Sequence, residues 1–222
     1  ISTGLASGHV SKYLSVLKDS GFVERRIPLT VKKNSRAGRY HITDPYLRFY
    51  FRFLENRQEQ LALGIQDQAL AEISKHLIDF IGAYTWEEIC REWTIRAGAK
   101  GELPYLPDQV GSTWNAKAQV DVVGFNSMEK TLILGECKWT RSQTKPRVLK
   151  ELIEKKTNNI ILEEGSWQVF FTGFSRSGWT SGALAYEHQI KEELPSGSNW
   201  SASGIRLVDL AQLDQDLQEW TE

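Results

Sequence analysis

Apolar residues dominate two neighbouring stretches in the middle of the chain, residues 118–125 and 130–139. They alternate with polar residues at 118–122 and form a continuous run at 132–134. A short polar stretch, residues 126–129, separates the two stretches. Alternation with a period of two is typical of β-strands, and a brief polar break between two such stretches is typical of a turn. The pattern therefore predicts a β-hairpin.

The patterning around this hairpin predicts a single larger domain over residues 83–222. A helix is expected before the hairpin at about 85–98, then a strand at about 106–114. A helix at about 146–158 and a strand at 166–174 follow it. The resulting order is αβββαβ, which predicts an α/β (α+β) fold. A helix at 180–193, a strand at 204–208 and a closing helix at 209–220 extend this core.

The N-terminal 43 residues predict a partial winged helix-turn-helix module. Val10, Tyr13, Leu14 and Leu17 have the spacing of one helix face. Ser7 can cap this helix at its start, and Gly21 ends it. A strand at 22–33, a polar turn at 34–38 and a returning strand at 39–43 come next. A helix followed by a basic hairpin is typical of the second half of a winged helix.

Residues 44–82 predict a helical linker between the two modules. Asp44-Pro45 begins one helix, because proline is tolerated in the first turn, and residues 69–82 form a second, amphipathic helix. Aromatic residues are interleaved with two arginines along residues 46–54. Such residues can stack on nucleic-acid bases, but the helical pattern favours packing between the modules.

Composition places the chain among ordinary globular proteins. Apolar residues make up 41% and charged residues 25% of the sequence, and no apolar run is long enough to span a bilayer. The two cysteines, Cys90 and Cys137, do not make a disulfide framework, which favours the reducing cytoplasm. The four histidines are scattered, so a zinc site is not expected.

Positive charge is concentrated at the two places where contact with nucleic acid is expected. Residues 1–43 carry a net charge of +6, and the remainder carries −7. The basic side chains that could bind phosphate groups are Lys12, Lys32, Lys33, Arg36 and Arg39 in the winged helix, and Lys145 and Arg147 at the start of the helix 146–158. Solvated surfaces, or a winged helix that contacts protein, are the alternatives.

Three charged residues on the hairpin predict a metal site. Asp121 interrupts an apolar strand, and an unpaired carboxylate there would be costly to bury. Glu136 and Lys138 share one face of the next strand, whereas Cys137 points to the other face. Carboxylates of this kind bind Mg²⁺ or Mn²⁺, and a lysine beside them can position an attacking water. The alternatives are an aspartate on an exposed edge and a surface salt bridge between Glu136 and Lys138.

Glu87 is a further candidate for the same site. Residues 85–88 fit a capping box, in which Glu88 reaches back to the backbone amide of Thr85. This role for Glu88 leaves Glu87 to face the sheet, where it could join Asp121 and Glu136.

Val120-Asp121 followed by Glu136-Cys137-Lys138 resembles the PD-(D/E)xK nuclease superfamily. More closely, the chain resembles the C-terminal domain of the archaeal-type (DEXX-box) ATPase family; the matching stretches are residues 39–53, 86–92, 135–139 and 171–179. The resemblance implies a restriction-endonuclease-like core, with Glu87 near the metal. Gln119 departs from it, because the family often carries glutamate there. The chain begins at Ile1 without methionine and has no phosphate-binding loop, so we expect a preceding ATPase region.

Three functions are compatible with these features. The first is metal-dependent hydrolysis of nucleic acid, as a DNA endonuclease at the C-terminal end of a larger ATPase. The second is a catalytically inactive nuclease fold that binds DNA or a partner and regulates an ATPase. The third, a transcription regulator acting through residues 1–43, leaves the charged hairpin without a role.

Overall fold

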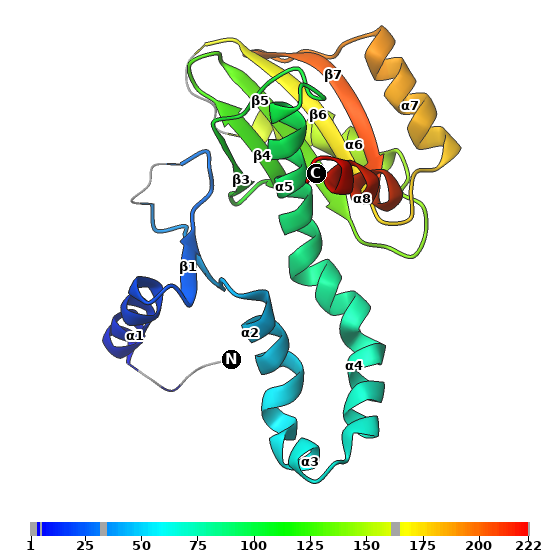
Figure 1. Cartoon of the computed structure of the whole chain (residues 1–222). Helices are drawn as coiled ribbons and strands as arrows, with labels where there is room; N and C mark the ends of the chain where they lie inside the picture. Colours follow the sequence, from blue (N-terminus) through cyan, green and yellow to red (C-terminus); the bar gives the residue numbers. More distant parts are fainter. Residues whose placement is uncertain (1–3, 5, 32–34, 161–164, 222) are drawn as a thin grey trace. The chain divides into compact units, whose positions relative to one another are not determined.

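A computed structural model describes residues 4, 6–31, 35–160 and 165–221. By its internal contacts the chain divides into two compact units (Figure 1). The first consists of residues 1–27 and 33–81, and the second of residues 28–32 and 82–222. The residues predicted as a winged helix and those predicted as a helical linker thus fall mainly in one unit.

The first unit begins with a helix and a two-stranded sheet. Helix α1 (Ser7–Asp19) is followed by the antiparallel strands β1 (Val23–Arg26) and β2 (Arg39–Ile42). Ser7 is the first helical residue and does not cap α1, contrary to the prediction. The first strand is also shorter than predicted, because the chain leaves the hairpin at Pro28, which has no backbone N–H to donate.

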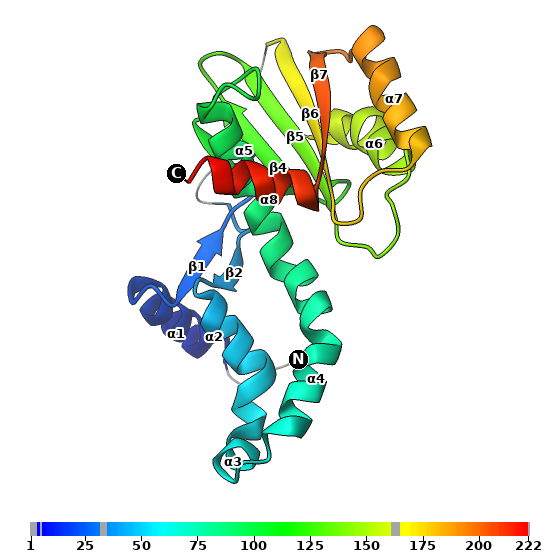
Figure 2. The same cartoon turned by 45° about the vertical axis from the view of Figure 1, so that its right-hand side comes forward.

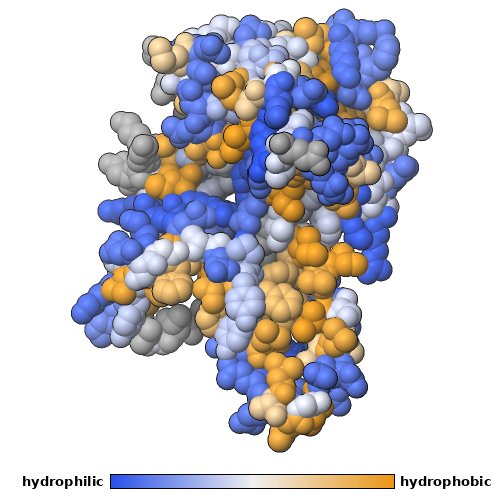
Figure 3. Space-filling view, in the orientation of Figure 1, coloured by the Kyte–Doolittle hydropathy of each residue, from blue (hydrophilic) through white to orange (hydrophobic). Residues whose placement is uncertain are grey.

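Short helical segments and a longer helix complete this unit. The short segments are α2 (Pro45–Phe49), η1 (Tyr50–Leu54), η2 (Glu55–Arg57) and α3 (Gln58–Ala62), and the longer helix is α4 (Gln66–Phe80). As predicted, the helix begins at Asp44-Pro45, and the Asp44 carboxylate accepts from the N–H of Tyr46 at 2.7 Å. The rings of Phe53 and Phe80 pack with centroids 5.3 Å apart. Other apolar side chains remain exposed, and Figure 3 shows them around α3 and the start of α4; they are Leu61, Leu63, Ile65 and Leu70.

The helical conformation continues from α4 through η3 (Ile81–Thr85) into α5 (Trp86–Ala99) without a break. The predicted capping box at Thr85 is therefore wrong: the backbone of Thr85 is already helical, and its side chain makes no capping hydrogen bond. The predicted helix end at Gly82 is also wrong, because the helical segments continue through this residue. A Cβ atom there would collide with the Trp139 ring, so glycine permits close packing rather than ending a helix.

The second unit contains a five-stranded mixed sheet. Its strands lie in the order β3-β4-β5-β6-β7, where the first three are antiparallel and the last three are parallel. The bounds are β3 Gln109–Trp114, β4 Gln119–Asn126, β5 Thr131–Lys138, β6 Trp167–Ser175 and β7 Trp200–Asp209. The predicted α/β (α+β) class is confirmed, as is the helix and strand order. The specific restriction-endonuclease-like fold stays a prediction.

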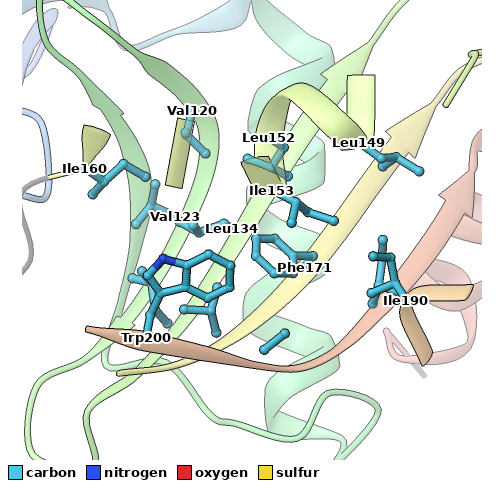
Figure 4. Close-up of a cluster of buried hydrophobic side chains, with 14 of the residues drawn as sticks. Val120, Val123, Leu134, Leu149, Leu152, Ile153, Ile160, Phe171, Ile190 and Trp200 are labelled. Carbon is cyan, nitrogen blue, oxygen red and sulfur yellow. The ribbon is translucent and has the colours of Figure 1, made fainter. Parts of the chain in front are cut away.

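Helices cover both faces of this sheet (Figure 2). They are α6 (Arg147–Lys150), η4 (Glu151–Lys156), η5 (Thr157–Asn159) and α7 (Ser181–Glu192) on one face, and α5 and α8 (Leu210–Glu219) on the other. The first face holds the cluster in Figure 4, which includes Val120, Val123, Leu134, Leu149, Leu152, Ile153 and Phe171. The second face holds a cluster with Trp86, Cys90, Trp93, Val122, Cys137 and Phe174.

A segment from between β1 and β2 lies along the outer edge of strand β3. The backbone N–H of Leu29 donates to the carbonyl of Ser112 at 3.1 Å, and the hydroxyl groups of Thr30 and Thr113 are 2.5 Å apart. Residues 28–31 therefore belong to the second unit, although their neighbours in the sequence belong to the first.

Candidate active site at the end of strands β4 and β5

Asp121 lies where the pairing between β4 and β5 ends. Val122 opposite Gly135 is the terminal pair of this ladder, and Asp121 follows it on β4. The Asp121 side chain is only 8% exposed, and its Oδ2 accepts from the backbone N–H of Cys137 at 3.0 Å. The Asp121 carboxylate thus accepts the hydrogen bond that a backbone carbonyl would accept in a continuing ladder. This bond gives one carboxylate oxygen a partner.

Glu136 lies beside it on β5 and is 2% exposed. Each of its oxygens is paired with an ammonium group: Oε2 with Lys138 at 3.1 Å and Oε1 with Lys156 at 2.5 Å. The predicted salt bridge between Glu136 and Lys138 exists, but its carboxylate is buried rather than on the surface. Removing its partners would therefore cost far more than breaking a surface pair.

Cys137 faces the opposite side of β5 from Glu136, as predicted. It packs in the second core cluster with Cys90 and Trp86. Burial raises the pKa of the Cys137 thiol well above its ordinary value, and the neighbouring Cys90 is the second cause of this shift. The thiol therefore stays neutral and anchors the backbone between the two charged residues of the strand.

Helix α5 brings Glu87 to the same place. The Glu87 carboxylate is 3.4 Å from the guanidinium of Arg91, one turn further along the helix. The same guanidinium donates to the backbone carbonyl of Asp121 at 3.0 Å. Arg91 therefore ties the start of α5 to strand β4.

The charges at this site act on one another. Burial, and then the negative charge of Asp121, raises the pKa of Glu136 although Lys138 and Lys156 oppose the change. The same two causes raise the pKa of Glu87. Burial lowers the pKa of Lys138, but the charges of Glu136 and Asp121 outweigh it, and its pKa is raised overall. Asp121 and Lys138 thus interact electrostatically with both Glu136 and Glu87.

The donor atoms fit a hard divalent cation in kind, because Asp121, Glu136 and Glu87 offer carboxylate oxygens. Their present arrangement is different: within the described ranges, no group of three or more His, Cys, Asp or Glu side chains could hold a metal ion as it stands. Ammonium groups occupy both oxygens of Glu136 instead. A cation at Glu136 would have to replace one of them.

The family DUF234, described as archaeal and bacterial proteins of unknown function, matches residues 50–161, which is half of the chain. The chain belongs to this family. The matched residues include α5, β4, β5 and η4, and therefore every side chain of the charged cluster described above.

A longer protein is similar to more than half of this chain. The uncharacterised protein MJECL04 of Methanocaldococcus jannaschii is 28% identical over 136 residues, which is 61% of this chain. The matched stretch spans 30% of the length of that relative. No solved structure matches the chain. Among the described helices, none is both long enough and apolar enough to cross a membrane.

The residues predicted to bind nucleic acid fall into two groups, one in each unit. Lys12 on α1, Arg36 in the turn and Arg39 on β2 are exposed in the first unit, outside the stretch matched by DUF234. Lys32 and Lys33 lie outside the described residues. In the second unit, Lys145 and Arg147 line an open groove of about 520 Å³, together with Pro146, Lys150, Glu151, Glu154 and Lys155.

Two residues of the cluster were not predicted from the sequence. Arg91 carries a weak signal, because its spacing of four from Glu87 is that of a helical ion pair. Lys156 carries none, since its neighbour Lys155 has the same chemistry and only the packing of η4 decides which lysine faces the sheet.

Proposed function

We propose that this DUF234 chain hydrolyses phosphodiester bonds of nucleic acid, with DNA as the substrate, in a reaction that depends on Mg²⁺ or Mn²⁺. One observation carries the proposal. Two buried carboxylates, Asp121 and Glu136, lie beside each other at the end of a β-hairpin, and Lys138 contacts the second. Buried like charges are costly to fold together and typically serve a site that binds a cation or does chemistry.

Each residue has a role in this proposal. Asp121 and Glu136 would hold the cation, with Glu87 as a further ligand, and the cation would supply the Lewis acid that phosphodiester hydrolysis needs. The ammonium of Lys138, held by Glu136, would orient the attacking water toward the phosphate. Arg91 would keep Glu87 and the β4 backbone in register through its bond to the Asp121 carbonyl.

A nuclease assay tests this proposal directly. The chain is incubated with single- and double-stranded DNA in Mg²⁺, Mn²⁺ or EDTA, and cleavage is followed on gels. Asp121→Asn and Lys138→Ala should each abolish the cation-dependent cleavage, since one removes a ligand charge and the other the positioning ammonium. Asp108→Asn is the matched control, because Asp108 is exposed and precedes strand β3. Cleavage that persists in both site variants would refute the proposal.

A second candidate is a non-catalytic module that recognises DNA or a partner protein. It is favoured by Gln119, which stands where the resembling family often has glutamate, and by the two ammonium groups on Glu136. Isothermal titration calorimetry separates the two candidates. Binding of Mg²⁺ or Mn²⁺ at millimolar concentration or tighter favours the hydrolase, and no binding favours the module.

We also propose that the chain works with an ATPase region. The support is the resemblance to archaeal-type ATPases and the greater length of the Methanocaldococcus relative. To test this part, the natural full-length protein is purified, and its ATP binding and ATP hydrolysis are measured with and without DNA. An absence of both ATP binding and ATP hydrolysis would contradict it.

A further inference from the structure

Two ammonium groups share one buried carboxylate at the candidate site. Lys156 Nζ lies 2.5 Å from Oε1 of Glu136, and Lys138 Nζ lies 3.1 Å from Oε2. The Glu136 side chain is 3% exposed, whereas the side chains of Lys156 and Lys138 are 26% and 33% exposed. The two ammonium groups are therefore more exposed than the carboxylate that they share, and both oxygens of that carboxylate are already paired.

The residues on either side of Lys156 are anchored in the core, whereas its own side chain is partly exposed. Lys156 is the last residue of η4, whose Leu152 and Ile153 are buried in the first core cluster. The next residue, Thr157, is buried, and its hydroxyl donates to the carbonyl of Leu152 at 2.8 Å. The lysine stem has four flexible carbons, which allow the ammonium to leave Glu136 while the helix stays in place.

We propose that Lys156 is the resident counter-ion of Glu136 and that a divalent cation must displace it to bind. This inference rests on the proposed function, because it concerns the same carboxylates. A buried carboxylate without partners is strongly unfavourable, so Lys156 stabilises the site when no cation is present. A cation at the same oxygen would meet electrostatic repulsion from the ammonium. Lys156 is thus a positioning residue that sets how tightly the site holds a cation.

Calorimetric titration of Mg²⁺ and Mn²⁺ into the whole chain tests this inference without a measurement of activity. Lys156→Gln keeps a hydrogen-bond donor for Glu136 but removes the competing charge, and should bind Mn²⁺ roughly tenfold more tightly than the unchanged chain. Lys156→Arg keeps the positive charge, and its guanidinium can donate two hydrogen bonds to a carboxylate. This variant should bind Mn²⁺ more weakly than the unchanged chain. Lys155→Gln, next in the chain but exposed, should leave the affinity unchanged.

The outcomes separate this inference from the proposed function. A residue with a purely structural role would weaken cation binding when replaced, so tighter binding by Lys156→Gln supports displacement. If the unchanged chain binds cations and Lys156→Gln binds them equally or less well, the inference is overturned and the proposed function stands. If only Lys156→Gln binds, the inference holds and the natural site is closed. If neither binds, both are overturned. Lys156→Arg decides the question if Lys156→Gln does not fold.

Discussion

Replacement of Asp121 by asparagine should stabilise the cation-free protein. The charge of Asp121 raises the pKa of both Glu136 and Glu87, so it repels two neighbours, and it attracts Lys138. Each interaction between partly buried charges is worth on the order of 1 kcal/mol, and solvent screens the part of Glu87, which is 35% exposed. Asparagine removes two repulsions and one attraction, and it also removes the cost of burying a charge. The sum is a gain of about 1 kcal/mol in the free energy of unfolding.

The hydrogen bond to Cys137 provides the control for this effect. Asparagine still offers an oxygen to the Cys137 N–H, whereas Asp121→Ala leaves that buried N–H without an acceptor. The alanine variant should therefore be about 1–3 kcal/mol less stable than the asparagine variant. Urea unfolding in EDTA, followed by circular dichroism, measures both differences.

The pH dependence gives the same comparison a second readout. Raised carboxyl pKa values mean that the folded chain binds protons more readily than the unfolded chain, so stability falls as pH rises from the ordinary glutamate pKa to the raised values. This fall should be smaller in Asp121→Asn, because the variant lowers the pKa of both glutamates. An asparagine variant that is less stable than the parent at pH 7 would refute the view that these carboxylates repel one another.

Three further predictions concern the sheet, the groove and the cation. Gly135→Ala should destabilise the fold by about 1–3 kcal/mol in urea unfolding, because the new Cβ would collide with the Thr172 hydroxyl; Gly182→Ala, with its nearest neighbour at 3.5 Å, should cost much less. Lys145→Ala and Arg147→Ala should each weaken DNA binding and lower the salt slope by about 0.9, and unchanged slopes in fluorescence anisotropy would contradict a phosphate contact. EDTA should end DNA cleavage and excess Mn²⁺ should restore it; cleavage unaffected by chelation would exclude a cation-dependent reaction.

The sheet was predictable because its pattern is local. Strands β4 and β5 match the two predicted stretches to within one residue at each end, because their apolar residues and the polar turn between them mark both strands locally. The placement of Asp121 beside Glu136 followed from the hairpin alone. The same reasoning failed at Thr85 and Gly82, where a capping pattern and a glycine coincide with uninterrupted helix.

The role of Gly82 and the position of Lys156 could not be predicted, because they depend on contacts between distant parts of the chain. Gly82 is required by the Trp139 ring, which is 57 positions away in the sequence. Lys156 meets Glu136 only because the buried residues of η4 set the rotation of that helix. Neither periodicity nor residue type distinguishes Lys156 from Lys155, so packing alone decided which lysine joined the site.

The hydrogen bond between Leu29 and Ser112 has a practical consequence for dividing this chain. Strand β3 is at the border of the five-stranded sheet, and residues 28–31 shield part of its backbone. A truncated chain that starts at residue 83 would lose this shield and present unpaired N–H and C=O groups to other molecules. Such a fragment should self-associate through edge-to-edge pairing, so nuclease and cation-binding measurements should retain the preceding residues.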